Sequence, residues 1–212
     1  MAKVVPTILA TSPDEYATML AKAEHVSRRV HVDITDGRFT DNRTINLEQV
    51  HVTEGTQIDL HLMVKDPAAE LSNAIGLHPS LVILHSESEG DVLGCLGKLR
   101  SMGIKAGLAI LPGTKVGELE PLVKSADHIL IFTGELGHNG GQFQTGQLSL
   151  ASQLRAIKPE LEISVDGGVN PEVAALSAIQ GVDVLYVGGY IQGATDPKVA
   201  YDEISSQLAV ST

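Results

Sequence analysis

Short apolar runs, rich in Val, Ile and Leu, recur along the whole chain and are separated by amphipathic or polar segments. Runs of this composition are typical of parallel strands that are buried on both faces. The runs that we expect to form strands cover residues 4–9, 29–34, 57–63, 81–85, 105–111, 128–132, 161–165 and 182–187.

The segments between these runs carry the signals of helices. Ser12-Pro13-Asp14-Glu15 offers an N-cap serine, a proline suited to the first turn and an acid three residues after the cap. Helices are expected to begin at Ser12, Leu47, Asp66 and Asn170 and to cover residues 91–102, 116–125, 148–157 and 196–208. Such βα units in a chain of 212 residues predict a (β/α)8 TIM barrel, with an open doubly wound sheet as the alternative. No Pro-, Gly- or Ser-rich linker divides the sequence, so residues 1–212 are expected to form a single domain.

Histidine and aspartate residues gather at the carboxyl ends of the predicted strands. Alternate residues of a strand face the same side, so His31 and Asp33 are expected to lie side by side. His61 stands near the end of the next strand, and Asp166 follows the seventh. A closed barrel brings these ends together at one mouth, whereas an open sheet would not.

His31, Asp33, His61 and Asp166 together offer two imidazoles and two carboxylates. Mixed nitrogen and oxygen ligands suit Zn²⁺, Fe²⁺ or Mn²⁺. Each of these residues alone could have a structural role. The recurrence of His and Asp at the carboxyl ends of several strands favours one shared metal site. His85 is expected to support the structure around the site rather than to bind the ion.

Glycine pairs follow three of the last strands: Gly140-Gly141, Gly167-Gly168 and Gly188-Gly189. Glycine lets a ligand approach the backbone N–H groups, and the loops after strands seven and eight are the usual phosphate site of this barrel. A metal ion beside two carboxylates and a phosphate site suggests chemistry next to a carbonyl group. One aspartate would remove a proton and the other would return one, so that a carbon is inverted.

Composition excludes several other functions. The formal net charge of −11 disfavours nucleic acid and anionic membranes as partners, and an aromatic content of 3% without Trp disfavours stacking on single strands. No apolar stretch approaches the ~20 residues that span a bilayer, and the amino terminus lacks the layout of a signal peptide. With Cys95 as the single cysteine, we expect a soluble protein of a reducing compartment, the cytoplasm.

The ordered motifs resemble the ribulose-phosphate 3-epimerase family over nearly the whole chain. They are P-T-I-L at Pro6, H-V-D-I-T-D-G-R-F at His31, N-R-T-I at Asn42, H-L-M at His61, H-S-E at His85, K-A-G-L at Lys105, G-G-Q at Gly140, V-D-G-G-V-N-P at Val165 and the closing G-V-D-V-L-Y-V-G-G. The resemblance implies that His31, Asp33, His61 and Asp166 bind a divalent metal and that Asp33 and Asp166 are the acid/base pair. It also implies that the three glycine loops hold the phosphate and that Thr7 replaces a substrate-contacting serine. The expected substrate-binding residues are Thr7, His61, Gly140, Gly141, Gly167, Gly168, Gly188 and Gly189.

The departures from the family pattern lie in the substrate half of the site. Ala10, Thr35, Leu111 and Phe132 stand where the family has other side chains, and Gly189 lacks a usual serine hydroxyl. The loop Glu135-Leu136-Gly137-His138-Asn139-Gly140-Gly141-Gln142 lacks the usual proline and gains an acid. If Glu135 faces inward, its charge would repel the phosphate.

The first hypothesis is therefore a metal-dependent epimerase that converts D-ribulose 5-phosphate to D-xylulose 5-phosphate through an enediolate, in the pentose phosphate pathway. A six-carbon ketose phosphate of the allulose 6-phosphate type is an alternative substrate. A non-catalytic sugar-phosphate-binding paralogue is a third possibility, which the retention of both aspartates argues against. We expect a homo-oligomer, whose subunit number the sequence leaves open.

Overall fold

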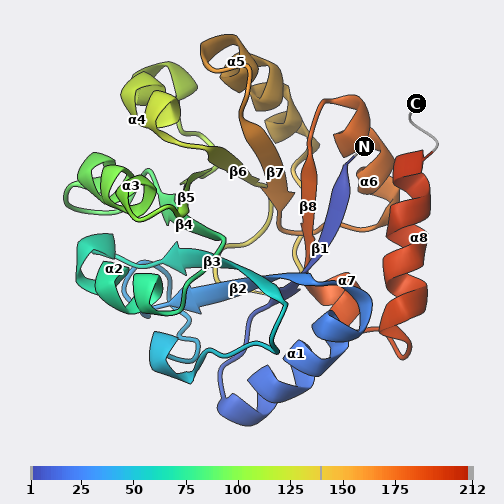
Figure 1. Ribbon diagram of the computed structural model, residues 1–212. Helices are drawn as coiled ribbons and strands as arrows, with labels where there is room; N and C mark the ends of the chain where they lie inside the picture. Colours follow the sequence, from blue (N-terminus) through green and yellow to red (C-terminus); the bar gives the residue numbers. More distant parts are fainter. Residues whose placement is uncertain (1, 139, 210–212) are drawn as a thin grey trace.

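Eight parallel strands close into a barrel in the computed structural model, which describes residues 2–138 and 140–209 (Figure 1). Each strand pairs with the next along the chain, and the last pairs with the first. The strands are β1 (Lys3–Ile8), β2 (Arg29–Thr35), β3 (Gln57–Met63), β4 (Leu81–His85), β5 (Lys105–Ile110), β6 (His128–Phe132), β7 (Glu162–Asp166) and β8 (Val184–Val187). The predicted TIM barrel is confirmed, and the open-sheet alternative is wrong.

Helices form a ring outside the strands (Figure 1). They are α1 (Pro13–Val26), α2 (Pro67–Gly76), α3 (Val92–Ser101), α4 (Glu120–Ser125), α5 (Leu150–Ile157), α6 (Pro171–Ile179), α7 (Gly189–Gln192) and α8 (Pro197–Ala209), with 3-10 turns η1 (Leu47–Gln49), η2 (Val116–Leu119) and η3 (Thr145–Ser149). Ser12, Asp66 and Asn170 accept backbone N–H groups of α1, α2 and α6 as their N-caps, as expected. Helix α8 packs beside α6 and α1, which closes the ring.

The helix predicted from Leu47 is wrong in its extent, because only the 3-10 turn η1 forms there. After Gln49 the backbone becomes extended at Val50 and continues to β3 at Gln57 without an α-helix. A turn over residues 53–56, in which the Thr56 N–H donates to the Thr53 carbonyl oxygen at 3.0 Å and Gly55 has a φ of +85°, then leads into β3.

The strands separate two apolar clusters. The larger lies between the strands and the helices, and the smaller lies inside the barrel, formed by Val5, Leu81, Ile83, Ala109, Leu130, Phe132, Val184 and Tyr186. Most of the buried polar side chains come from the inward-facing positions of β2, β3, β6 and β7. The interior of the barrel is therefore partly ionic, at both of its ends.

The amino-terminal end of the interior is filled by an ion-pair network, which we call the plug. Arg29 Nε contacts Asp59 Oδ2 at 2.7 Å, and the Arg29 guanidinium reaches Glu162 Oε2 at 3.1 Å. His128 Nδ1 lies 2.9 Å from Glu162 Oε2, and the Tyr186 hydroxyl donates to Asp59 Oδ2. This end of the barrel carries its own cation.

In the parts of the chain described above, no helix is long and apolar enough to cross a membrane.

Candidate metal and substrate site

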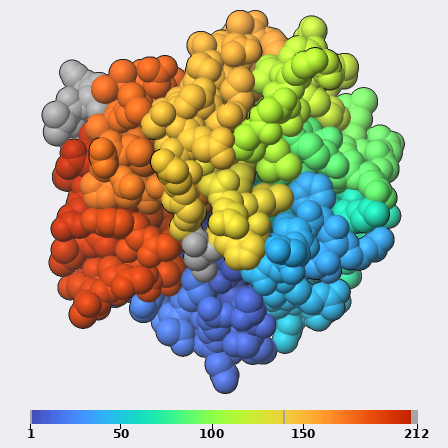
Figure 2. Space-filling view, turned by 180° about the vertical axis from the view of Figure 1, so that it is seen from behind, coloured from blue at the N-terminus to red at the C-terminus, as the bar shows by residue number. Residues whose placement is uncertain are grey.

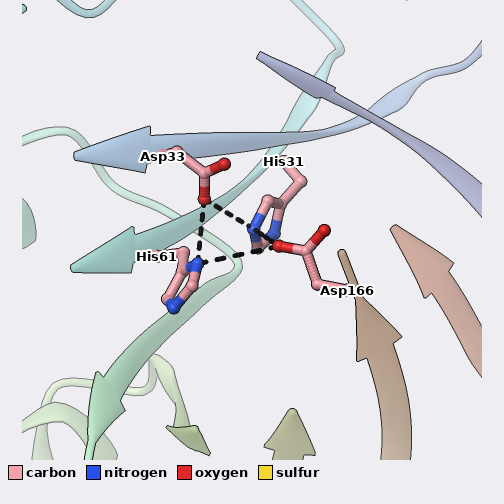
Figure 3. A group of neighbouring side chains, drawn as sticks. All are labelled: His31, Asp33, His61 and Asp166. Carbon is pink, nitrogen blue, oxygen red and sulfur yellow. Dashed lines mark hydrogen bonds and ion pairs between the residues drawn. The ribbon is translucent and has the colours of Figure 1, made fainter. Parts of the chain in front are cut away.

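Four side chains from three strands meet at the carboxyl end of the barrel (Figure 3). His31 and Asp33 project from the same face of β2, and the β2–β3 register pairs Asp33 with His61. Asp166 is the last residue of β7 and faces the other three from across the barrel (Figure 3). The expected convergence of these residues is therefore found.

The ligand atoms of the four residues all lie within 4.8 Å of one another. Oδ1 of Asp33 is 2.8 Å from Nδ1 of His61 and 3.1 Å from Nε2 of His31. Oδ2 of Asp166 is 3.7 Å from Nε2 of His31 and 4.0 Å from Nδ1 of His61. Two nitrogens and two oxygens thus point at one small volume, which is the arrangement that a single bound cation needs.

The charge balance of this group also fits a cation. Both carboxylates are buried, with exposed fractions of 4% for Asp33 and 7% for Asp166. Within residues 2–138 and 140–209, no lysine or arginine forms an ion pair with either of them. Two buried carboxylates without a fixed positive partner are costly, and a divalent ion would offset that cost.

The pKa values of the two aspartates are shifted from the ordinary value in opposite directions. Burial and the charge of Asp33 raise the pKa of Asp166 to about 7. Burial alone would raise the pKa of Asp33 as well, but His31 and His61 hold it well below its usual range. A pair of carboxyl groups driven apart in this way can supply one acid and one base.

A cavity opens above the four residues. Its lining includes Thr7, Asp33, Phe132, His138, Asp166 and Tyr190, together with Gly137, Gly140, Gly167, Gly168, Gly188 and Gly189. The Thr7 hydroxyl is buried and has no hydrogen-bond partner. His61 is fully buried and is not part of the lining, so it faces the carboxylates rather than the open space.

The glycine loops pack against one another around this cavity. Gly167 and Gly168 have φ values of +99° and +75°, which favour glycine. A Cβ on Gly168 would lie 2.7 Å from the carbonyl oxygen of Gly141, and one on Gly167 would meet the backbone of Gly134. Gly141 is not part of the lining, whereas the other five predicted glycines border the cavity.

The β6–α5 segment lies over the centre of this face, next to the β2–β3 connection (Figure 2). Asn42 Nδ2 donates to the carbonyl oxygen of Gly137 at 2.7 Å, which joins the two segments. Glu135 is exposed and does not border the cavity, so the condition for repulsion of a phosphate is not met. Asn139 of the same loop lies outside the described residues.

Several residues were not singled out from the sequence as parts of the site. His138 borders the cavity, although nothing in a polar loop sequence signals the direction of its side chain. The ring of Tyr186 lies 3.9 Å from that of His31, and Met63 joins the lining. Tyr186 and Met63 occupy inward positions of β8 and β3, so strict alternation along each strand could have identified them.

Residues 3–192 match the ribulose-phosphate 3 epimerase family. The chain is 29% identical over 207 residues to the cytoplasmic isoform of ribulose-phosphate 3-epimerase from Oryza sativa subsp. japonica, covering 92% of this chain and 90% of the rice protein. It is 28% identical over 216 residues to ribulose-phosphate 3-epimerase from Bacillus subtilis, covering 96% and 98% of the two chains.

Solved structures resemble the fold at lower identity. A 3-keto-L-gulonate-6-phosphate decarboxylase from Vibrio cholerae superposes with a TM-score of 0.75 at 15% identity, over 100% of this chain and 99% of the other. A 3-hexulose-6-phosphate synthase from Salmonella typhimurium gives a TM-score of 0.71 at 16% identity, over 99% and 100%. At these identities the likeness concerns the barrel alone.

Proposed function

Because the chain belongs to the ribulose-phosphate 3-epimerase family, a family of isomerases, we propose that it inverts C3 of a ketose phosphate. The proposed reaction is the interconversion of D-ribulose 5-phosphate and D-xylulose 5-phosphate. The observation that carries the proposal is the pair Asp33 and Asp166, which border one cavity from opposite sides of the barrel and differ strongly in pKa.

The cation is assigned to His31, Asp33, His61 and Asp166, because their ligand atoms converge without a lysine or arginine to balance the carboxylates. Zn²⁺, Fe²⁺ and Mn²⁺ suit this donor set. When bound, such an ion offsets the negative charge that develops on the substrate oxygens as the neighbouring proton leaves.

The proton transfers fall to the two aspartates. Asp33, whose pKa is low, is ionised and removes the C3 proton from one face of the sugar. Asp166, whose pKa of about 7 leaves it partly protonated at neutral pH in the metal-free protein, is proposed to give a proton to the opposite face. The reverse reaction exchanges these two roles.

The phosphate is assigned to the loops that carry Gly140, Gly167, Gly168, Gly188 and Gly189. Glycine leaves the backbone N–H groups of these loops open to close approach, which suits a phosphate dianion. Thr7 is proposed to donate its unpartnered hydroxyl to the substrate. We further propose that residues 1–212, of which Met1, Asn139 and residues 210–212 lie outside the described part, form one cytoplasmic domain that assembles into a homo-oligomer.

Solvent-deuterium incorporation at C3 tests the proposal, measured by proton NMR across a panel of five- and six-carbon ketose phosphates. We expect exchange and epimerisation of D-ribulose 5-phosphate at a kcat/KM above that of every other sugar. Preference for a six-carbon ketose phosphate would change the substrate but keep the reaction. Binding without exchange for every sugar would overturn the epimerase and indicate a sugar-phosphate-binding protein.

A further inference from the structure

A series of buried polar contacts leads from the candidate metal site into the wall of the barrel. Nε2 of His61 lies 2.9 Å from Nε2 of His85, the last residue of β4. Both rings are fully buried and stacked, with centroids 5.0 Å apart. A neutral imidazole has one N–H group, so one of these two nitrogens donates and the other accepts.

The far side of His85 faces Glu87. Nδ1 of His85 and Oε2 of Glu87 are 3.5 Å apart, both atoms are buried, and neither has a hydrogen bond to any other group. The other oxygen of Glu87 accepts from the backbone N–H of Leu111 at 3.1 Å and from the Thr114 hydroxyl at 2.5 Å. These two bonds hold the carboxylate in place, so Oε2 is directed at His85.

The order of donors follows from the carboxylate. Glu87 can only accept, so it favours a proton on Nδ1 of His85. Nε2 of His85 then accepts from His61, which places the proton of His61 on Nε2 and leaves a lone pair on Nδ1. Without a cation, Oδ1 of Asp33 at 2.8 Å competes for a proton on Nδ1 of His61, and a histidine with that proton could not bind a cation. Glu87 acts against this competing acceptor.

We propose that Glu87, acting through His85, selects the tautomer of His61 that binds the cation. Glu87 is thus a positioning residue, which touches neither the cation nor the sugar. This inference rests on the metal site of the proposed function but not on the identity of the substrate. A hydrogen-bonded partner behind a ligating histidine raises metal affinity by fixing the ring and its proton.

Glu87→Gln is the sharpest test, because it replaces the acceptor that faces His85 with a donor and keeps the shape of the side chain. The amide oxygen can keep the bonds from Leu111 and Thr114, which turns the NH₂ group toward Nδ1 of His85. A donor at that point favours the wrong tautomer in both rings. We expect affinity for Mn²⁺ and Zn²⁺ to fall about 10- to 100-fold, measured by competition with a chelator of known affinity.

The tautomers are read directly from the histidine nitrogens in multiple-bond ¹H–¹⁵N NMR spectra of the metal-free protein. Relative to wild type, E87Q should raise the fraction of His61 that carries its proton on Nδ1. Neither measurement needs a sugar, so a failure of the epimerase assignment would not be mistaken for a failure of this inference.

Two variants separate positioning from simple loss of structure. Glu89→Gln makes the same chemical change two residues away, at an exposed carboxylate whose ion pair is with Lys65, and should leave affinity unchanged. Thr114→Val removes a bond that anchors Glu87 but keeps the acceptor facing His85. Wild-type affinity in E87Q, or equal losses in E87Q and T114V with the His61 tautomer unchanged, would overturn the inference.

Discussion

The two ends of the barrel interior both bury carboxylates, but they balance the charge in different ways. At the amino-terminal end, the plug contains Arg29, which pairs with Asp59 and Glu162. At the carboxyl end, Asp33 and Asp166 contact histidines, and the charge of Asp33 acts on Asp166. No lysine or arginine is paired with either carboxylate in the described ranges 2–138 and 140–209. The carboxylates of the plug are paired with a cation of the chain itself, whereas the four residues at the mouth could hold a bound cation.

The pKa values show the same difference. In the plug, burial opposes ionisation of Glu162, but hydrogen bonds from His128 and Arg29 keep its pKa well below the usual range. At the mouth, burial and the neighbouring charge of Asp33 leave Asp166 with a pKa of about 7. A carboxyl group that titrates near neutral pH is suited to proton transfer, and a permanently ionised one is suited to structure.

Removal of the plug cation should have the largest effect. Arg29→Met leaves Asp59 and Glu162 without their partner, and breaking a buried pair costs about 3–5 kcal/mol of unfolding free energy. Urea unfolding measures the loss. As a control, Arg28→Met at the exposed neighbouring residue should change the unfolding free energy by no more than about 0.5 kcal/mol. An R29M protein as stable as wild type would mean that the plug does not hold this end together.

Loss of either aspartate at the mouth should abolish turnover rather than folding. Asp33→Asn and Asp166→Asn keep the shape of the side chain but cannot accept a proton, so each should lose at least about 10²-fold in kcat. Metal content is measured alongside and restored where it falls.

In deuterated water the two variants should prefer opposite epimers for C3 exchange, because each keeps the carboxylate of one face. Equal exchange of both epimers by both variants would favour one carboxylate acting on both faces.

The mouth should bind about one divalent cation per chain, as measured by elemental analysis of protein from a metal-sufficient host. Free ion at 100 times its Kd should stabilise the fold by about 2.7 kcal/mol, and a chelator should reverse this. His61→Ala should lose both the ion and the activity, with folding checked by circular dichroism. A variant that keeps both would show that the strand-three histidine is not a ligand.

Acid should weaken the plug through Glu162. Its folded pKa lies below the ordinary value of 4.5, so its stabilisation is present above pH 4.5 and is lost as the pH falls toward the folded pKa. At pH 7, Glu162→Gln should cost about 1.5–3 kcal/mol of unfolding free energy. The difference from wild type should begin to shrink below about pH 5 and should keep shrinking as the pH falls toward the folded pKa. A constant difference would contradict the assignment.

The smallest effects are expected from the rim of the mouth. His138 borders the cavity and Glu135 does not, so His138→Asn should raise the KM of the phosphorylated sugar by about two- to fivefold at low salt. Glu135→Gln should leave that KM unchanged at low and high salt. A lower KM in E135Q at low salt only would show that Glu135 faces the substrate when the sugar is bound.

Much of this architecture is readable from local sequence. The β-branched runs and the caps at Ser12, Asp66 and Asn170 predict the order of strands and helices, because each signal depends on neighbours in the chain. The alternation within 29–34 places His31 and Asp33 on one face for the same reason. The recurrence of His and Asp at strand ends then predicts a shared site, since all strands of a closed barrel end at one mouth.

Contacts between distant segments decided the rest. The strand register places Asp33 beside His61, and the segment that begins at Leu47 forms only the 3-10 turn η1. Asn42 donates a hydrogen bond to Gly137 in the loop after β6. In that loop His138 borders the cavity and Glu135 does not. At the end of β4, Glu87 likewise accepts from the backbone of Leu111 after β5, and His85 contacts His61 on β3. The sequence by itself determined which faces are buried and which side chains stand at the mouth, because periodicity is local. Only the tertiary structure decided which of these atoms are partners, because hydrogen bonding depends on the spacing of segments that are far apart in the chain.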